Sequence, residues 1–215
     1  AEISPPRGAG TGAITETAGL LRDWVDAVNV TDNQGSNVRL ASWAGSLAAL
    51  QAGLEPVMQM TCRDRNRIAL QSDLLGASAL GIRNILVMTG DHPKFGDHPE
   101  AKPVFDLDSI QLLWTLRHMR DQGATLSGKK LNPPPECFLG AVENPFAPPE
   151  GFRADRLGKK VEAKEVKLAM LAILFHPLLI LCGAGLFAAT AWGVKTVANP
   201  GPHGFSEILY EFTSA

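Results

Sequence analysis

The chain has 215 residues, of which 45% are hydrophobic, and its formal net charge is −2. This nearly neutral balance gives no electrostatic basis for binding nucleic acid. The three cysteines, Cys62, Cys137 and Cys182, are too few and too widely spaced for a disulfide framework or a zinc site. There is no methionine at position 1 and the first residues have the pattern of a strand, so we expect a fragment of a longer chain.

Short apolar runs alternate with amphipathic stretches along residues 1–160. The runs predict strands at residues 1–4, 26–32, 56–62, 84–91 and 137–144. The stretches between them predict helices at residues 14–25, 38–54, 65–82 and 109–122, because their apolar residues recur every three or four positions. Gly53 and Gly81 stand where helix C-caps are expected. Such βα units in succession predict an α/β fold with a parallel sheet.

Polar residues lie at the carboxyl end of every predicted strand. They are Glu2 with Ser4, Thr31 with Asp32, Thr61 with Cys62, Thr89-Gly90-Asp91, and Glu143 with Asn144. A doubly wound sheet concentrates its site at one switch point, whereas a TIM barrel gathers ligands from the ends of many strands. The distributed pattern favours a TIM barrel, and we expect a partial one because a complete barrel has eight strands.

The loop from Thr89 to Ser109 is long and rich in Gly, Pro, Asp and His. Long loops at the carboxyl ends of strands often carry functional residues. Asp91 could orient a cationic or hydrogen-bonding ligand. His92 and His98 suggest a metal ion, but the repeated GDHP is also typical of turns, and HxH or HxxxH spacing is missing. We therefore expect no metal site.

Two further patterns leave alternatives open. CRDRNR, from Cys62 to Arg67, could form an anion cradle at the start of a helix or a solvated first turn. Glu2 is a carboxylate on an apolar strand, and such a group is rarely buried unless it is paired or catalytic. Burial would raise its pKa toward the range of a general acid.

Five segments of the chain together resemble the N-terminal half of the methylenetetrahydrofolate reductase family. They are EISPPRG, VDAVNVTDN, EPVMQMTCRDRNRIALQSDLLGA, GIRNILVMTGDHPKFGDHPEAKPVFDLDS and GAVENPFAPP. The resemblance runs from residue 1 to about residue 163 and implies a cytoplasmic, flavin-dependent TIM-barrel enzyme. It implies hydride transfer through FAD to 5,10-methylenetetrahydrofolate, giving 5-methyltetrahydrofolate, with electrons from a nicotinamide or from a partner protein.

The resemblance also implies roles for individual residues. Glu2 matches the general acid that protonates the folate as its ring opens, and Asp91 matches a carboxylate that lies beside the flavin and the pterin. The other positions that match contacts to FAD are Thr31, Gln59, Thr89, Gly90, Phe105, Asp106, Leu107, Val142, Asp155 and Lys160. Gln59 replaces a histidine and Val142 an aromatic residue of better-known members. Asp155 and Lys160 match contacts on the phosphate and ribose side.

The last quarter of the chain has a different character. A charged amphipathic helix is predicted from residue 153, and then Leu168–Val194 carries no Asp, Glu, Lys or Arg. That stretch is long enough to span a bilayer, and the alternative is a buried core helix. Pro177 should kink the helix. His176 is either functional, as histidines in membranes often are, or a peculiarity of this sequence.

LGKKVEAKEVKLAMLAIL and NPGPHGFSEILYEFTSA resemble the potassium-transporting subunit of the Kdp-type potassium ATPase, over residues 157–215. The resemblance implies an inner-membrane segment followed by a short re-entrant helix. Leu157–Ala163 fits both families. We therefore interpret the chain as a chimaera of a reductase-like part, residues 1–163, and a membrane part, residues 164–215. A misassembled gene explains it better than a natural fusion. The competing hypotheses are an inactive reductase fragment, a fragment of a transport protein, and a chain without physiological function.

Overall fold

The computed structural model describes residues 1–144 and 148–162. Its strands are β1 (Glu2–Ile3), β2 (Ala27–Val30), β3 (Glu55–Thr61), β4 (Asn84–Met88) and β5 (Phe138–Ala141). Its α-helices are α1 (Gly12–Leu21), α2 (Ser42–Gln51), α3 (Arg67–Ala79), α4 (Ser109–Gln122) and α5 (Glu150–Glu162). Every strand and helix expected within residues 1–160 is present, and the predicted α/β class is confirmed.

Local sequence signals determine where the helices begin and end. Asp108 and Gln111 form a capping box at the start of α4, in which the Gln111 amide donates to Asp108 at 2.7 Å and the Asp108 amide to Gln111 at 3.0 Å. Gly53 and Gly81 follow α2 and α3 with φ of +82° and +84°, which are values that only glycine adopts readily. The prediction of C-cap glycines at these two positions is therefore confirmed.

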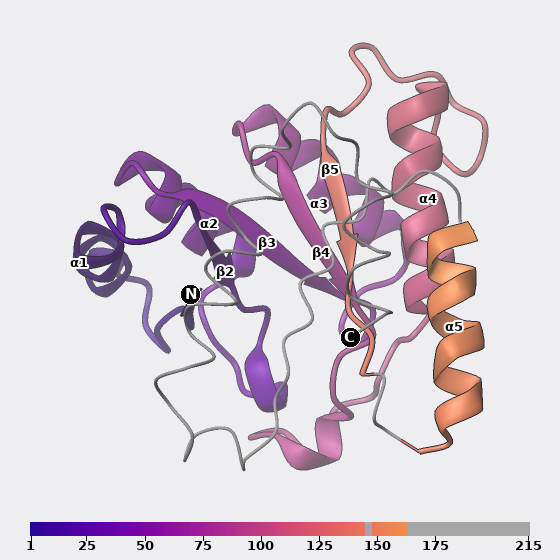
Figure 1. Ribbon diagram of the computed structural model, residues 1–215, viewed down its shortest axis with the longest axis horizontal. Helices are drawn as coiled ribbons and strands as arrows, with labels where there is room; N and C mark the ends of the chain where they lie inside the picture. The colour runs from indigo at the N-terminus through magenta and orange to yellow at the C-terminus, as the bar shows by residue number, and fades with distance from the viewer. Residues whose placement is uncertain (145–147, 163–215) are drawn as a thin grey trace, which may run out of the picture. The chain divides into compact units, whose positions relative to one another are not determined.

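The strands form a parallel sheet in the order β1-β2-β3-β4-β5. A doubly wound sheet reverses its order at a switch point, and this sheet shows no reversal among the described strands. The sequential order is therefore compatible with a partial TIM barrel. Figure 1 shows α1 and α2 toward the β2 end of the sheet, and α4 and α5 side by side beyond β5.

One face of the sheet is apolar and packs against the helices. β1, β2, α1 and α2 meet through Ile3, Ile14, Ala18, Val28, Val30 and Ala49. β3, β4, β5, α3 and α4 meet through Met58, Met60, Leu70, Ile85, Val87, Leu112, Leu116 and Leu139. Because side chains alternate along a strand, the residues between these positions lie on the other face.

That other face, called the inner face below, is polar at the carboxyl ends of the strands. Its side chains include those of Glu2, Asn29, Thr31, Gln59 and Thr61, which occupy alternate positions along β1, β2 and β3 and just beyond them. In the register of the sheet, Glu2 lies beside Asn29. The fold thus gathers polar groups from three separate segments on one surface, and the apolar core holds that surface in place.

The predicted span Leu168–Val194 and the short helix expected after Asn199 lie outside the described residues. Within residues 1–144 and 148–162, every helix is too short or too polar to cross a membrane.

Candidate active site

A chain of hydrogen bonds links the ends of β1 and β2 on the inner face. The Thr31 hydroxyl donates to Ser4 Oγ at 3.4 Å, and Ser4 donates to the Gln34 side-chain oxygen at 2.8 Å. The Gln34 amide nitrogen then donates to the Glu2 carboxylate at 3.5 Å. Gln34 was not predicted, because it lies in a loop and no local pattern marks it. The side chains in this chain of hydrogen bonds are uncharged, so none of them balances the negative charge of the Glu2 carboxylate.

The environment of Glu2 favours its protonated form. Glu2 is exposed, but partial desolvation raises its pKa above the usual value, although a hydrogen bond with Gln59 and the charge of the N-terminal amino group act in the opposite direction. Glu2 therefore keeps its proton to a higher pH than a free glutamic acid. This direction of the pKa shift is the one expected of a general acid.

Asn29, the neighbour of Glu2 in the sheet, has an unused acceptor. The residue is 3% exposed, and its Oδ1 atom has no hydrogen-bond partner in the described part of the chain. Buried polar atoms are rarely left unpaired without a reason. The inner face thus offers a carbonyl oxygen next to an acid, an arrangement suited to a ligand that presents an N–H group.

The structure brings Thr31 and Gln59 together but places Thr89 elsewhere. Thr31 and Gln59 are 1% and 5% exposed and share the inner face. The Thr89 hydroxyl lies 3.4 Å from Ser109 Oγ in α4, and the Arg156 guanidinium of α5 lies 3.4 Å from Thr89. The side chain of Thr89 therefore points to the helix layer, and only the main chain at this position can face a ligand on the inner face.

Gly90 and Asp91 begin the long loop after β4. Gly90 has φ of +88°, and a Cβ atom there would lie 3.1 Å from Thr61 Cβ and 3.2 Å from Arg63 Cβ, so this position requires glycine. The Asp91 carbonyl accepts hydrogen bonds from the Ser36 hydroxyl at 2.9 Å and from Arg63 Nη1 at 3.3 Å. The main chain of Asp91 is thus fixed while its carboxylate remains exposed.

The next predicted cofactor-binding stretch, Phe105–Leu107, is largely committed to the fold. The Arg67 guanidinium binds the Asp106 carboxylate at 2.8 and 2.9 Å, and these hydrogen bonds lower the pKa of Asp106 to about 2. Leu107 is buried in the core of β3, β4 and α4. Phe105, with φ of +39°, is exposed. Of these three side chains, that of Phe105 is exposed, that of Asp106 is half-buried and that of Leu107 is buried.

Lys160 and Val142 meet at the end of β5. Lys160 Nζ donates to the Val142 carbonyl, and it donates to the Glu143 carboxylate at 2.8 Å. Burial lowers the pKa of Lys160 despite its pairing with Glu143. The lysine is 4% exposed, so its ammonium group serves mainly to dock α5. Asp155 lies on the same helix and is exposed.

The arginines of CRDRNR are engaged within the protein. Arg63 pairs with Asp64 at 2.7 Å, Arg65 with Asp32 and with Asp73, the latter at 2.9 Å, and Arg67 with Asp106. Arg63 and Arg65 are 2% and 19% exposed. The segment is therefore no free cradle for anions. The alternative of a solvated first turn holds for Arg67, which is 51% exposed, but not for Arg63 and Arg65.

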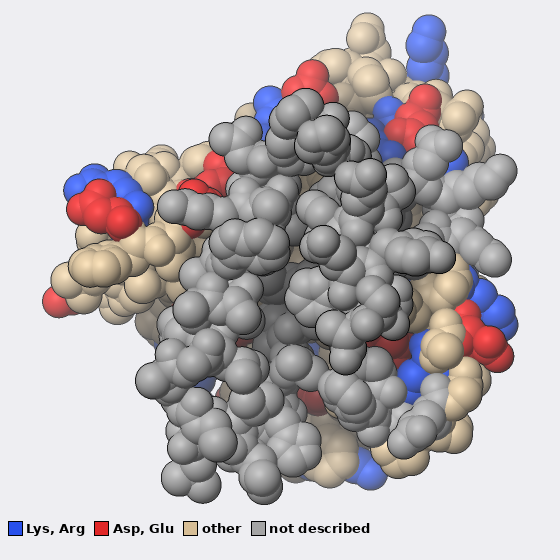
Figure 2. Space-filling view, viewed as in Figure 1, with Lys and Arg blue, Asp and Glu red and all other residues tan. Residues whose placement is uncertain are grey.

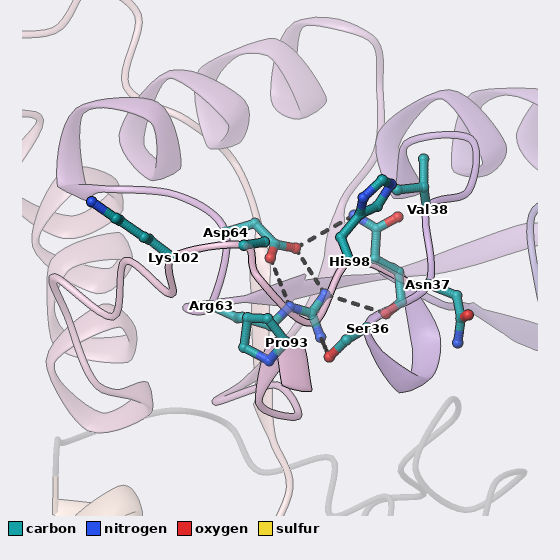
Figure 3. Close-up of a pocket in the computed structure, with 10 residues that line it drawn as sticks. Ser36, Asn37, Val38, Arg63, Asp64, Pro93, His98 and Lys102 are labelled. Carbon is teal, nitrogen blue, oxygen red and sulfur yellow. Dashed lines mark hydrogen bonds and ion pairs between the residues drawn. The ribbon is translucent and has the colours of Figure 1, made fainter. Parts of the chain in front are cut away.

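A cavity of about 190 Å³ lies between the loops that follow β2, β3 and β4 (Figure 3). It is lined by Asn33, Ser36, Asn37, Val38, Arg63, Asp64, Pro93, His98, Ala101 and Lys102. Figure 3 shows the Arg63 guanidinium with Asp64 on one side and Ser36 on the other. The loop residues on which this arrangement depends are not neighbours in the sequence, and this is why the sequence did not reveal it.

The histidines and cysteines of the described chain have ordinary structural surroundings. His92 Nδ1 accepts a hydrogen bond from the Lys94 amide at 3.2 Å, as expected of a turn. Within residues 1–144 and 148–162, no three His, Cys, Asp or Glu side chains are grouped as metal ligands. Burial raises the pKa of the Cys62 thiol to about 12 and that of Cys137 to about 11. Both thiols are therefore poor nucleophiles at neutral pH.

On the described surface visible in Figure 2, basic side chains lie beside acidic ones at the periphery. Exposed ion pairs of this kind include Arg22 with Asp23 and Arg83 with Glu136. This distribution agrees with the nearly neutral net charge.

Comparison with known proteins divides the chain in two. Residues 1–128 match the family model described as methylenetetrahydrofolate reductase, and residues 151–215 match that of the potassium-transporting ATPase A subunit. Potassium-binding subunits of potassium-transporting ATPases are 56% identical over 64 residues in Brucella anthropi, 60% over 65 in Methylorubrum populi and 51% over 65 in Escherichia coli. Each alignment covers 30% of this chain and 11% or 12% of the relative. The chain thus spans about a tenth of the length of these relatives. Both resemblances found in the sequence are confirmed.

Proposed function

We propose, since the chain belongs to the methylenetetrahydrofolate reductase family over residues 1–128, that this part is built for the flavin-dependent reduction of 5,10-methylenetetrahydrofolate to 5-methyltetrahydrofolate. The observation that carries the proposal is Glu2. Its raised pKa and its position on the inner face beside Thr31 and Gln59 suit a proton donor at a ligand site. We further propose that the five-stranded sheet is part of a TIM barrel.

The inner face fits a flavin. Flavin rings carry N–H and carbonyl groups, and the buried amide of Gln59, the hydroxyl of Thr31 and the unused oxygen of Asn29 offer matching partners. Gly90 lets the main chain after β4 pass close to Thr61 and Arg63, where a Cβ atom would be crowded, and so supports the position of this segment. When bound, the flavin supplies the hydride chemistry, and the protein supplies position and electrostatics. The electrons would come from a nicotinamide or from a partner protein.

Glu2 and Asp91 would act on the folate. Glu2 would donate a proton to the ring nitrogen of the folate as its five-membered ring opens, and the raised pKa of its carboxyl supports this role. Asp91 would stabilise the positive charge that ring opening creates, because its carboxylate is exposed at the same strand ends while its carbonyl is fixed.

The experiment that tests this proposal is titration of the purified chain with FAD. We expect quenching of FAD fluorescence, and we expect Gln59→Leu to weaken binding at least tenfold, since a buried amide that faces the ring is lost. The matched control is Gln122→Leu at the exposed end of α4, which should bind FAD like the parent chain. An unquenched parent chain, or equal losses in the two variants, would contradict the proposal.

A second function is suggested by the match to the potassium-transporting family over residues 151–215. We propose that Leu168–Val194 crosses the inner membrane. Lysines 159, 160, 164 and 167 precede the span and only Lys195 follows it closely, so positive charge favours a cytoplasmic N-terminal part and an outward-facing tail. The two family matches are consistent with a chimaera of two truncated pieces.

This topology predicts the behaviour of a reporter enzyme fused after Ala215 and expressed in bacteria. A reporter that is active only in the periplasm should give full signal, and one that is active only in the cytoplasm should give none. The control replaces Leu174 and Leu181 with arginine, which should prevent insertion and reverse both results. Cytoplasmic signal from the unaltered chain would mean that the segment is a buried helix.

A further inference from the structure

The Arg63 side chain holds three loops together at the carboxyl end of the sheet. Its Nε and Nη2 atoms donate to Asp64 at 2.7 and 2.8 Å. Nη1 donates to Ser36 Oγ at 3.0 Å and to the Asp91 carbonyl at 3.3 Å, and Nη2 donates to the Asn33 carbonyl at 3.2 Å. A guanidinium has five N–H groups, and all five are used here. The loops after β2, β3 and β4 therefore meet on one planar group.

Ser36 strengthens the same junction. Its hydroxyl donates to the carbonyls of Asp91 and His92 at 2.9 and 3.2 Å, in addition to accepting from Arg63. Ser36 has φ of +60°, a conformation that is uncommon for a residue other than glycine. The backbone contacts around it are close, since a Cβ atom on Gly96 would lie 1.9 Å from the Ser36 carbonyl oxygen.

A third link lies at the far side of the loop after β4. The Val38 amide donates to both carboxylate oxygens of Asp97, at 3.1 and 3.2 Å. The loop is thus tied to the loop after β2 at residues 91–92 and again at residue 97. Among the described side chains that link these loops, that of Arg63 is fully buried, at 2% exposed.

We propose that Arg63 is a positioning residue, which fixes the main chain of Asp91 and so sets where the Asp91 carboxylate can reach. The proposal rests on the proposed function in one respect, namely that the folate is the molecule on which the Asp91 carboxylate acts. The cavity above Arg63 is not itself a site for an anion, because the arginine has no donor left for a ligand. Its buried charge is balanced by Asp64, and its remaining hydrogen bonds go to the two neighbouring loops.

Hydrogen exchange of the ligand-free full-length chain tests the positioning. Arg63→Met keeps much of the side-chain length but removes all five donors, and we expect exchange at the amides of Phe95 and Gly96 to accelerate at least tenfold relative to amides of α4. Arg63→Lys should restore little of the protection, since an ammonium group cannot span the partners of a planar fork. The matched control is Arg65→Met, which removes another arginine of the same segment whose hydrogen bonds go to Asp32, Asp73 and Thr61 and not to this loop.

A spectroscopic measurement separates positioning from general loosening. With FAD bound, Asp91→Asn should change the absorbance spectrum of the flavin, Arg63→Met should reproduce that change, and Arg65→Met should not. Equal acceleration of loop exchange in the Arg63 and Arg65 variants would overturn the proposal. If the loop amides exchange faster in Arg63→Met than in Arg65→Met but no flavin binds, the proposed function fails. The conclusion that Arg63 fixes the loop then still stands.

Discussion

Replacing Asp32 with alanine should lower the free energy of unfolding by about 3 kcal/mol. The Asp32 carboxylate is 3% exposed, and it accepts hydrogen bonds from the Thr61 amide at 2.8 Å, from the Thr61 hydroxyl at 2.9 Å and from the Arg65 guanidinium. Alanine would leave Arg65 with Asp73 as its remaining carboxylate partner and would leave both Thr61 donors in a buried place without their acceptor.

Urea denaturation, with the slope of the unfolding curve compared between variants, measures this loss. Asp23→Ala is the matched control, because Asp23 is 84% exposed and its ion pair with Arg22 is 4.0 Å long. It should change stability by less than about 0.5 kcal/mol. Similar values for the two alanine variants would show that the Asp32 network does not hold the fold together.

The helices and strands could be predicted because the sequence patterns that specify them are local. Helix α4 was predicted at residues 109–122, where the structure has it, since Asp108 and Gln111 mark its start and Gly123, with φ of +58°, marks its end. Strand β1 was expected at residues 1–4 and is only Glu2–Ile3. Its sequence is too short to show an alternating pattern, so the hydrogen bonds of the neighbouring strand decide its length.

The candidate site was predicted less completely, because the residues that form hydrogen bonds within it come from loops that are distant in the sequence. Glu2, Thr31 and Gln59 were named from the sequence, but Gln34, which bridges Ser4 and Glu2, was not. The resemblance assigns Thr89 to the flavin, and alternation from Val87 on the helix face indicates that its main chain, rather than its side chain, would make that contact. Arg63 stood in a recognised segment, yet its role depends on two carbonyls about 30 residues away along the chain.

Helix α5 is attached to α4 and to the end of β5. It lies within the stretch matched by the potassium-transporting family, which begins at residue 151, yet it packs against α4 and the end of β5. Three ion pairs contribute to this attachment. Glu143, which is 6% exposed, lies 3.3 Å from Arg153, 3.6 Å from Arg156 and 2.8 Å from Lys160. Although burial alone would raise the pKa of Glu143, these cations, Lys160 first, hold it below its usual value.

This arrangement fixes the pH dependence of the attachment. A carboxylate whose pKa is lowered by folding stabilises the folded state above its usual pKa of 4.5, and this stabilisation disappears as the pH falls through the lowered value. The docking of α5 should therefore be complete at neutral pH and should weaken as the pH falls below 4.5, which hydrogen exchange of α5 at a series of pH values would measure.

Replacing Glu143 with alanine should release α5 and cost about 3 kcal/mol, because it leaves the buried ammonium of Lys160 with the Val142 carbonyl but no carboxylate. Urea denaturation measures the loss, and hydrogen exchange of α5 shows whether it is local. Glu136→Ala, which removes an exposed partner of Arg83, is the control and should be nearly neutral. Adding Lys160→Met to Glu143→Ala should recover at least half of the loss, since the unpaired buried charge is then gone. If the double variant is no more stable than Glu143→Ala, the cost arises from packing at the end of β5 and the ion pairs do not dock the helix.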